Sequence, residues 1–415
     1  MSEKKNTGKK AVIAVIVIAL IVVIIALVAV ISGKSKKGGS KSATEAGSET
    51  MRSGQFDIDY AKQVTKLADY SGIAITVSND YEINDTAKQK YLTNVLQSYG
   101  ADAYKQVTDR DTVADGDYVK VDYTGYKDGK AFDGGSATDV MLDVANNSQV
   151  GGSSFIDGFT KPLIGAKVGD KVKGDVTFPE DYGNDDLNGQ TVTFEYTVKG
   201  IYSADPVALA DMTDEQVNTV FGKAGVTTNA QLTTQIEKDL KQQLYSAEVD
   251  KIKSYMIENS TVEIPDEYLQ ARLNEYIASF TKENVKDGQT LKKYLKSNYN
   301  MTVDQATEKW KENLTDQIKT EFIFGLIAEK ENIKMDDDAF NSYVDYIVSA
   351  SNGQFSKASE VYKYFGSGHK DEGKTYLKNQ YLVNKAIDTV TEKANVTFED
   401  GSAAPDTSSG SADAE

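Results

Sequence analysis

Residues 121–135, with the sequence VDYTGYKDGKAFDGG, bring aromatic and acidic side chains together around a short turn. Tyr123 lies in a stretch where apolar and polar residues alternate, which predicts a half-buried strand. Gly129 can take the positive φ of a tight hairpin turn, and the returning strand carries Phe132 and Asp133. Such a hairpin either contributes its aromatic rings to a core or presents them to a ligand as an apolar binding surface.

The composition excludes several other kinds of chemistry. The chain has no cysteine and one histidine, His369, which lies in a glycine-rich turn and is expected to be an ordinary loop residue. Thiol catalysis, disulfides, cysteine metal sites and histidine-rich metal sites are therefore excluded. We expect no metal and no cofactor. The formal net charge of -17 argues against a nucleic-acid partner, because such proteins need a basic surface to displace counterions from phosphate.

One segment predicts a membrane span. Residues 11–31 contain no polar side chain, and at about 1.5 Å per helical residue they would cross the roughly 30 Å core of a bilayer. We expect an uncleaved signal anchor, because a signal peptide would have a shorter apolar region and a small-x-small cleavage site. Lysines flank both ends almost equally, but the short lysine-rich tail at 1–10 is expected to stay in the cytoplasm. The later domains are then expected at the outer face of the cell membrane.

The elements that would position the aromatic residues lie between 117 and 202, where turn residues are regular and glycine is dense. The pattern predicts a small half-barrel or curved antiparallel sheet. The predicted elements are strands at 119–123, 140–144, 171–178 and 191–201, with a short helix at 159–164.

Helical patterns surround this region. Before it, apolar residues at helical spacing predict helices at 55–70 and 87–103, on either side of a strand at 72–78. After residue 205 the apolar spacing predicts a series of long helices. The last stretch, 398–415, is rich in Ser, Ala, Asp and Glu and is expected to be disordered.

Several motifs follow one another in a specific order. VDYTGYKDGKAFDGG, SFIDGF with LIGAKVGDKV, FPEDYG and TFEYTVKGI together resemble an FKBP-type peptidyl-prolyl isomerase domain, most closely the version inserted in trigger factor. The later stretches MIENSTVEIPDEYLQARLNEY and FGLIAEKENIKMDDDAF resemble the C-terminal chaperone arms of trigger factor. The resemblance extends over about residues 76–396.

The resemblance implies an α+β multidomain fold. It would combine an N-terminal transmembrane helix, an FKBP-like curved antiparallel β half-barrel and an all-α domain like the C-terminal part of trigger factor. The expected boundaries are a cytoplasmic tail at 1–10, a transmembrane anchor at 11–31, a flexible linker at 32–54, a connector at 55–115, the isomerase domain at 116–202, the helical chaperone domain at 203–397 and the acidic tail at 398–415.

The resemblance also places the family's proline-binding pocket on this chain. The positions that correspond to catalytic residues are Tyr123, Phe132, Asp133, Ile156, Phe159, Tyr182 and Phe194. The positions that correspond to further substrate contacts are Val140, Phe155 and Leu187.

Their implied roles fit a reaction without covalent chemistry. Phe159 would form the floor of the pocket, and the Ile156 N–H and the Tyr182 hydroxyl would donate hydrogen bonds to the substrate. Asp133 would place negative charge near the rotating carbonyl or orient Tyr123. Rotation about an X-Pro amide must break its conjugation, and an apolar pocket favours the twisted amide because that form is less polar than the planar one.

Two features depart from the family pattern. Val140 takes a place where many relatives have an aromatic wall, which implies a shallower pocket and weaker activity. The ribosome-docking region of trigger factor, with its Gly-Phe-Arg loop, is not visible, so we expect no docking on ribosomes. Exposed apolar patches on the helical arms could instead bind unfolded segments. The candidates for those patches are Phe322, Phe324 and Leu326, and Tyr362, Tyr364 and Phe365.

The sequence thus predicts a membrane-anchored foldase that isomerises X-Pro bonds and holds unfolded exported chains. The alternative is a non-catalytic chaperone or adaptor that keeps the FKBP-like domain only for peptide binding, and Val140 favours it. A structural protein of the envelope is a third possibility with little motif support. The expected partners are unfolded or proline-containing polypeptides.

Overall fold

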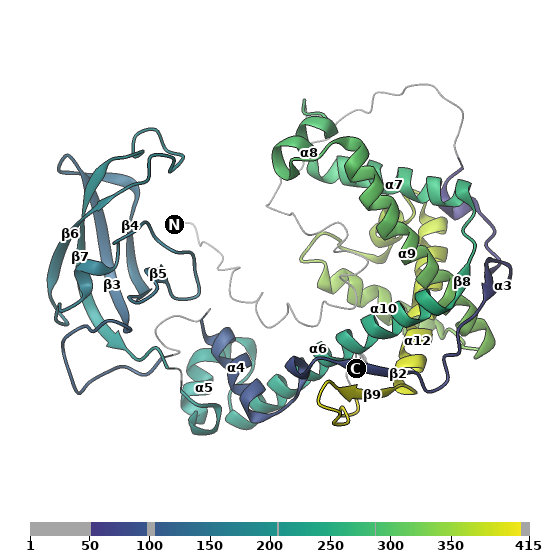
Figure 1. Ribbon diagram of the computed structural model, residues 1–415, viewed down its shortest axis with the longest axis horizontal. Coiled ribbons are helices and arrows are strands. Elements are labelled where there is room, and N and C mark those ends of the chain that lie inside the picture. The colour runs from purple at the N-terminus through teal and green to yellow at the C-terminus, as the bar shows by residue number, and fades with distance from the viewer. Residues whose placement is uncertain (1–50, 98–103, 206, 287, 408–415) are drawn as a thin grey trace. The chain divides into compact units, whose positions relative to one another are not determined.

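The computed structural model describes residues 51–97, 104–205, 207–286 and 288–407, whose helices and strands are labelled in Figure 1. These residues form two compact units. One consists of Ile83–Leu240, and the other of residues 51–82 together with the chain from Lys241 onward. The division falls within helix α6 (Asn229–Asn259).

A curved antiparallel sheet dominates the first unit, which we call the sheet unit (Figure 1). Its strand order is β5-β4-β3-β7-β6, so strands distant in the sequence lie side by side at its centre. All four predicted strands between 117 and 202 coincide with strands of this sheet, although those predicted at 140–144 and 171–178 end one residue too late. The strands are β3 (Tyr118–Lys127), β4 (Lys130–Asp143), β5 (Ser148–Gln149), β6 (Lys171–Thr177) and β7 (Thr191–Tyr202).

One face of the sheet is buried by strict alternation. Along β7, Val192, Phe194, Tyr196 and Val198 are buried, whereas the intervening residues are at least partly exposed. This period of two is what a strand with one core-facing side requires. The predicted helix at 159–164 is present only as the 3-10 turn η4 (Lys161–Leu163), which packs beside β6.

A small helical cluster completes the sheet unit. Asn84 caps α4 (Asp85–Leu96) by accepting a hydrogen bond from the Ala87 N–H. The described part of the predicted helix at 87–103 therefore ends at Leu96, and 98–103 lie outside the described residues. The other elements of this helical cluster are the 3-10 turns η5 (Leu209–Asp211) and η6 (Gly222–Ala224), helix α5 (Asp214–Phe221) and the first part of α6.

The second unit, which we call the helical unit, is built from long helices. Two short strand pairs accompany them: β1 (Val64–Lys66) with β8 (Thr261–Val262), and the parallel pair β2 (Ala74–Val77) with β9 (Asn395–Phe398). The helices are α7 (Asp266–Asn284), α8 (Leu291–Tyr299), α9 (Val303–Lys330), α10 (Asp337–Ala350), α11 (Ala358–Phe365) and α12 (Lys370–Glu392).

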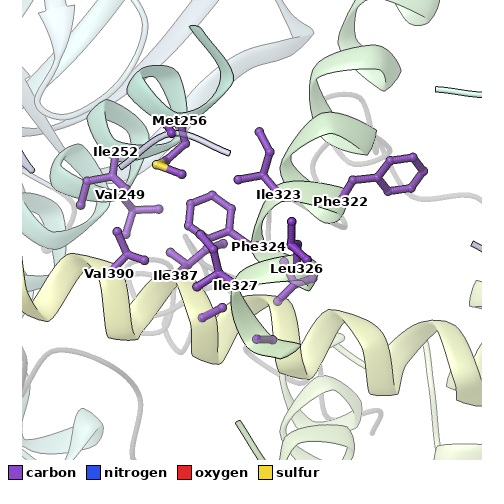
Figure 2. Close-up of a cluster of buried hydrophobic side chains, with 14 of the residues drawn as sticks. Val249, Ile252, Met256, Phe322, Ile323, Phe324, Leu326, Ile327, Ile387 and Val390 are labelled. Carbon is purple, nitrogen blue, oxygen red and sulfur yellow. The ribbon is translucent and has the colours of Figure 1, made fainter. Parts of the chain in front are cut away.

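The core of the helical unit forms around the C-terminal half of α9. Figure 2 shows Phe324 and Ile327 of α9 among side chains from α6 and α12. The run FIFGLIA at 322–328 is apolar on every side of the helix, which is typical of a fully buried helical segment. The predicted exposed patch at Phe322, Phe324 and Leu326 is therefore wrong, because these residues are 2%, 0% and 6% exposed.

The second predicted patch is wrong for a similar reason. Tyr362 is buried, and Tyr364 and Phe365 are half-buried against a core formed by α10, α11 and α12. The Tyr364 and Phe365 rings also contact each other, with centroids 5.2 Å apart. Tyr364 also lines an open groove, but neither group of three residues is exposed as the predicted patch.

The helix predicted at 55–70 is also wrong over most of its length. Only the 3-10 turn η1 (Ser53–Gln55) and the single turn α3 (Tyr60–Gln63) are helical, and β1 follows directly. The apolar side chains at helical spacing contact distant partners instead. The Phe56 ring packs on Tyr268 at 5.5 Å, and the Tyr60 ring lies over Gly325 of α9.

Part of the predicted disordered tail is ordered. After β9 the chain turns back, and the Ala404 N–H donates a hydrogen bond to the Val396 carbonyl. Thr407 is 5% exposed, and its hydroxyl donates a hydrogen bond to the buried Glu248 at 2.5 Å. Hydrogen bonds to the main body of the unit therefore hold the chain as far as residue 407.

No helix in the described part of the chain is both long and apolar enough to cross a membrane. The predicted fold class is therefore wrong in including a transmembrane helix, and the stretch at 11–31 lies outside the described residues. The remaining parts of the predicted class, the curved antiparallel half-barrel and the helical C-terminal region, agree with the structure.

Candidate functional site

Six aromatic rings gather on the buried side of the sheet around Phe159, which is 2% exposed. The rings of Phe194, Tyr123 and Tyr196 meet Phe159 edge to face, with centroids at 4.8, 5.1 and 5.5 Å. Phe155 stacks on it at 4.2 Å with an interplanar angle of 15°. We call this group the aromatic cluster, and it consists of Tyr123, Phe132, Phe155, Phe159, Phe194 and Tyr196.

Glycines make room for one of these rings. The Phe132 ring lies over Gly125 of β3 and Gly135 of β4, where an added Cβ atom would approach it to 2.6 Å. The same ring contacts Phe194 at 6.0 Å and Phe178 at 6.2 Å. A side chain at either glycine would therefore push Phe132 out of the cluster.

Asn147 fixes the loop that carries Phe155 and Phe159. Its side-chain amide donates hydrogen bonds to the carbonyls of Phe155 at 3.2 Å and Ile156 at 2.9 Å. The Asn147 side-chain oxygen accepts hydrogen bonds from the Thr160 N–H at 2.9 Å and from the Thr160 hydroxyl at 3.1 Å. Among the described residues, no acceptor is hydrogen-bonded to the Ile156 N–H, so this donor is available to a ligand.

A buried tyrosine completes the support of the floor residue. The Tyr196 hydroxyl donates a hydrogen bond to the Phe159 carbonyl at 2.6 Å. Burial raises the pKa of Tyr196, so the hydroxyl stays protonated and keeps this bond. Sequence reasoning did not include Tyr196 or Asn147 in the site. The alternation along β7 could have indicated Tyr196, whereas no pattern in the sequence indicates Asn147.

The remaining predicted residues lie around the cluster at different depths. Leu187 is buried, and Ile156 and Val140 are half-buried against the same core. Tyr182 is 49% exposed, and its ring packs on Phe178 with the centroids 4.6 Å apart. Asp133 is exposed, and no hydrogen bond joins it to Tyr123 among the described residues.

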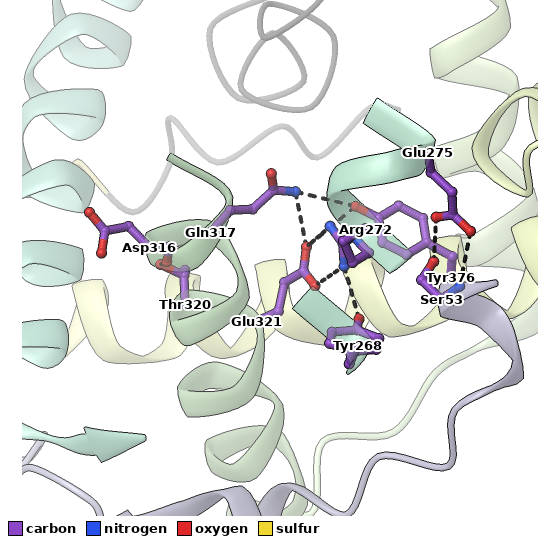
Figure 3. Close-up of polar contacts among 9 residues, drawn as sticks. All are labelled: Ser53, Tyr268, Arg272, Glu275, Asp316, Gln317, Thr320, Glu321 and Tyr376. Atoms are coloured by element: carbon purple, nitrogen blue, oxygen red, sulfur yellow. Dashed lines mark hydrogen bonds and ion pairs between the residues drawn. The ribbon is translucent and has the colours of Figure 1, made fainter. Parts of the chain in front are cut away.

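The helical unit contains a buried ion pair, drawn in Figure 3. The Arg272 guanidinium donates to both carboxylate oxygens of Glu321, at 2.8 and 3.1 Å. The Tyr268 hydroxyl accepts a further hydrogen bond from Arg272, and Gln317 donates to Glu321. Because these groups satisfy one another, we interpret the pair as part of the core and not as a binding site.

An open groove lies elsewhere in the helical unit, between α7 and the region around α11. Its volume is about 790 Å³. Ala278 and Ser279 of α7 form one side, and Phe355 and Tyr364 lie on the other. Lys282, Glu283, Glu360 and Lys363 add charges of both signs. No group of side chains suited to a metal ion occurs among the described residues.

Comparison with known proteins gives two family matches. Residues 110–199 match the FKBP-type peptidyl-prolyl cis-trans isomerase family, and residues 227–392 match the bacterial trigger factor C-terminus. The first match contains the whole aromatic cluster. The second contains α7 to α12.

Similar proteins include trigger factors from several bacteria. The protein from Agathobacter rectalis is 28% identical over 79% of this chain and 69% of its own length. The trigger factor of Clostridium beijerinckii is 30% identical over 67% of this chain and 62% of its own length, and that of Acetivibrio thermocellus is 27% identical over 81% and 74%. The chain therefore spans about two thirds of the length of these relatives.

These matches bear on the predicted location and on the family. The predicted location at the cell membrane is corrected by the comparisons, because the relatives are trigger factors, and no helix in the described part of the chain could cross a membrane. The predicted resemblance, in contrast, is confirmed by both matches. The chain is a trigger factor-like protein that combines an FKBP-type domain with a trigger factor C-terminal domain.

Proposed function

We propose that this protein is a peptidyl-prolyl cis-trans isomerase that also holds unfolded polypeptide segments. The observation that best supports isomerisation is the aromatic cluster around Phe159, within the FKBP-type match. The barrier to rotation about an X-Pro amide is about 18–20 kcal/mol. Water solvates the polar planar amide better than the twisted one, so an apolar site lowers the barrier relative to water.

Hydrogen-bond donors at the edge of the cluster would orient the substrate. The Ile156 N–H would bind a substrate carbonyl, and the exposed Tyr182 hydroxyl would act as a second donor. The carboxylate of Asp133 would place negative charge beside the rotating carbonyl. Phe159 would form the floor beneath the prolyl ring, with Tyr123 beside it.

Apolar side chains would enclose the substrate on the remaining sides. Phe132 and Phe194 are proposed as walls, because the Phe194 ring packs on Phe159 at 4.8 Å and the Phe132 ring packs on Phe194 at 6.0 Å. Val140, Phe155 and Leu187 would contact residues next to the proline. No nucleophile, proton transfer or metal ion is needed for this reaction.

The groove in the helical unit is the proposed site for unfolded segments. It is open, and aromatic rings of Phe355 and Tyr364 lie beside charges of both signs. Such a surface can accept apolar side chains without requiring one sequence. The family match over residues 227–392 supports a chaperone role for this unit.

A non-catalytic peptide-binding module is the second candidate. Val140 supports it, because this half-buried side chain offers less wall than an aromatic ring would. This candidate predicts that the protein suppresses aggregation of unfolded clients without accelerating any proline-limited step.

A refolding assay with the full chain separates the two. Uncatalysed X-Pro isomerisation takes about tens of seconds, so even a weak enzyme would accelerate the refolding of a proline-limited protein. We expect acceleration by the wild type and by Phe280→Ala, a matched control in the helical unit, but not by Phe159→Ala. If no variant accelerates refolding and all suppress aggregation, the isomerase proposal fails and the binding module takes its place.

A further inference from the structure

The stacking of Phe155 on Phe159 affects how a substrate could enter the cluster. The two rings are 4.2 Å apart and nearly parallel, at 15°. The other rings around Phe159 are steeply inclined to it, with angles of 86° for Tyr123, 75° for Phe194 and 76° for Tyr196. Phe155 is therefore the one ring of the aromatic cluster that stacks in parallel on a face of Phe159.

A prolyl ring cannot share that face with Phe155. Non-bonded carbon atoms approach to about 3.5–4.0 Å, so the 4.2 Å between the two rings leaves no space for another layer. A substrate proline that packs flat on this face of Phe159 must first displace Phe155.

The surrounding contacts indicate which part of Phe155 can move. The Phe155 backbone is held on both sides. Its N–H donates a hydrogen bond to the Asn147 backbone carbonyl at 2.9 Å, and its carbonyl accepts one from the Asn147 side chain. The ring is only half-buried, and the preceding residues 151–154, with the sequence GGSS, are exposed. Rotation of the side chain toward solvent therefore requires no rearrangement of the loop backbone.

We propose that Phe155 is a gate that closes the prolyl site and selects substrates by the residue next to proline. This inference rests on the proposed isomerase function. Opening the gate exposes the Phe155 ring to water, unless a neighbouring substrate side chain covers it. A leucine or phenylalanine before proline can cover the ring, whereas an alanine cannot, so bulky apolar residues at that position are favoured.

The kinetic consequence is a specific change in KM. A stacked aromatic pair adds stability equivalent to roughly 2- to 12-fold in an equilibrium constant. Removing the ring in Phe155→Ala should lower KM for an Ala-Pro tetrapeptide by about that factor and leave kcat nearly unchanged. The preference for Leu-Pro over Ala-Pro tetrapeptides should shrink at the same time.

The test compares both tetrapeptides with the full-length wild type, Phe155→Ala and Phe155→Leu, with peptide affinity measured by titration calorimetry in parallel. Phe155→Leu keeps apolar bulk but cannot stack, so it decides the question if Phe155→Ala does not fold. Ile164→Ala, which shortens an exposed apolar side chain of the same unit, is the matched control and should leave KM unchanged.

The outcomes distinguish the gate from the function on which it rests. A higher KM for both peptides in Phe155→Ala and Phe155→Leu would mean that Phe155 is a fixed wall, and the gate would be rejected. If no protein catalyses but Phe155→Ala binds the Ala-Pro peptide more tightly than wild type does, the gate stands and the isomerase proposal fails. Equal peptide affinity in wild type and both variants would also reject the gate.

Discussion

Removing the carboxylate of Glu321 should destabilise the helical unit strongly. Arg272 and Glu321 are only 8% and 6% exposed, so Glu321→Ala leaves a guanidinium charge in an environment that excludes water. Burial opposes that charge, but Glu321 and neighbouring groups outweigh it and raise the pKa of Arg272. Arg272 stays charged after the substitution because a guanidinium is not deprotonated in proteins. Breaking such a pair by removing one partner costs about 3–5 kcal/mol.

Two further variants separate charge from packing. Glu321→Gln keeps an acceptor for Arg272 and Gln317 but removes the negative charge, so an intermediate loss is expected. Replacing both partners, as in Arg272→Met with Glu321→Leu, removes the buried charges together. This double variant should be within about 1 kcal/mol of wild type or more stable, because apolar residues of similar size can replace a buried ion pair.

Urea unfolding, followed by tryptophan fluorescence, measures the free energy of unfolding of the helical unit in each variant. Trp310 is the only tryptophan of the chain, and its ring lies 4.9 Å from Phe280 in the helical unit. Asp316→Ala is the control, because it breaks an exposed pair with Lys319 on the same helix and should cost less than about 0.5 kcal/mol. An equally small loss for Glu321→Ala would refute the reasoning, since it would mean that water reaches Arg272.

Two other substitutions test single groups. Burial raises the pKa of Glu248, so the folded state binds this proton more tightly than the unfolded state, and its contribution to stability falls as pH rises through the raised pKa. Glu248→Gln should therefore be more stable than wild type in urea at pH 7, and the difference should disappear below the ordinary glutamate pKa of about 4.3. Tyr196→Phe removes the hydrogen bond to the Phe159 carbonyl and should cost the sheet unit about 1 kcal/mol, measured by hydrogen exchange of the β7 amides. Unchanged exchange in Tyr196→Phe would show that this bond adds no net stability.

The strands of the sheet unit were predictable because their signal is local. Alternation along β7 identifies Phe194 as a core-facing residue, and the turn at Gly129 fixes the pairing of β3 with β4. The motifs then identified which aromatic residues belong to the cluster. None of this required knowledge of contacts between distant segments.

Predictions failed where tertiary partners determine the structure. Phe56 and Tyr60 have helical spacing, yet the Phe56 ring packs on Tyr268 and the Tyr60 ring packs on α9. The chain between them is not helical. Packing these rings against other elements stabilises the fold more than a short local helix would, because an isolated helix of this length is only marginally stable. The FIFGLIA stretch of α9 was misjudged for the opposite reason, since apolar residues on every side of a helix indicate burial and not an exposed arm.

The arrangement of Phe155 and Phe159 shows the limit of sequence reasoning within the site itself. In a helix, side chains four residues apart lie on one face, but here a turn closed by the Phe159 N–H and the Ile156 carbonyl brings the two rings together. The Asn147 side chain holds that turn, and an asparagine in a loop has many possible roles. The identity of both aromatic residues follows from the motif, whereas their stacking depends on a hydrogen-bond partner that the motif does not include. The proposed gate therefore could be inferred only from the structure.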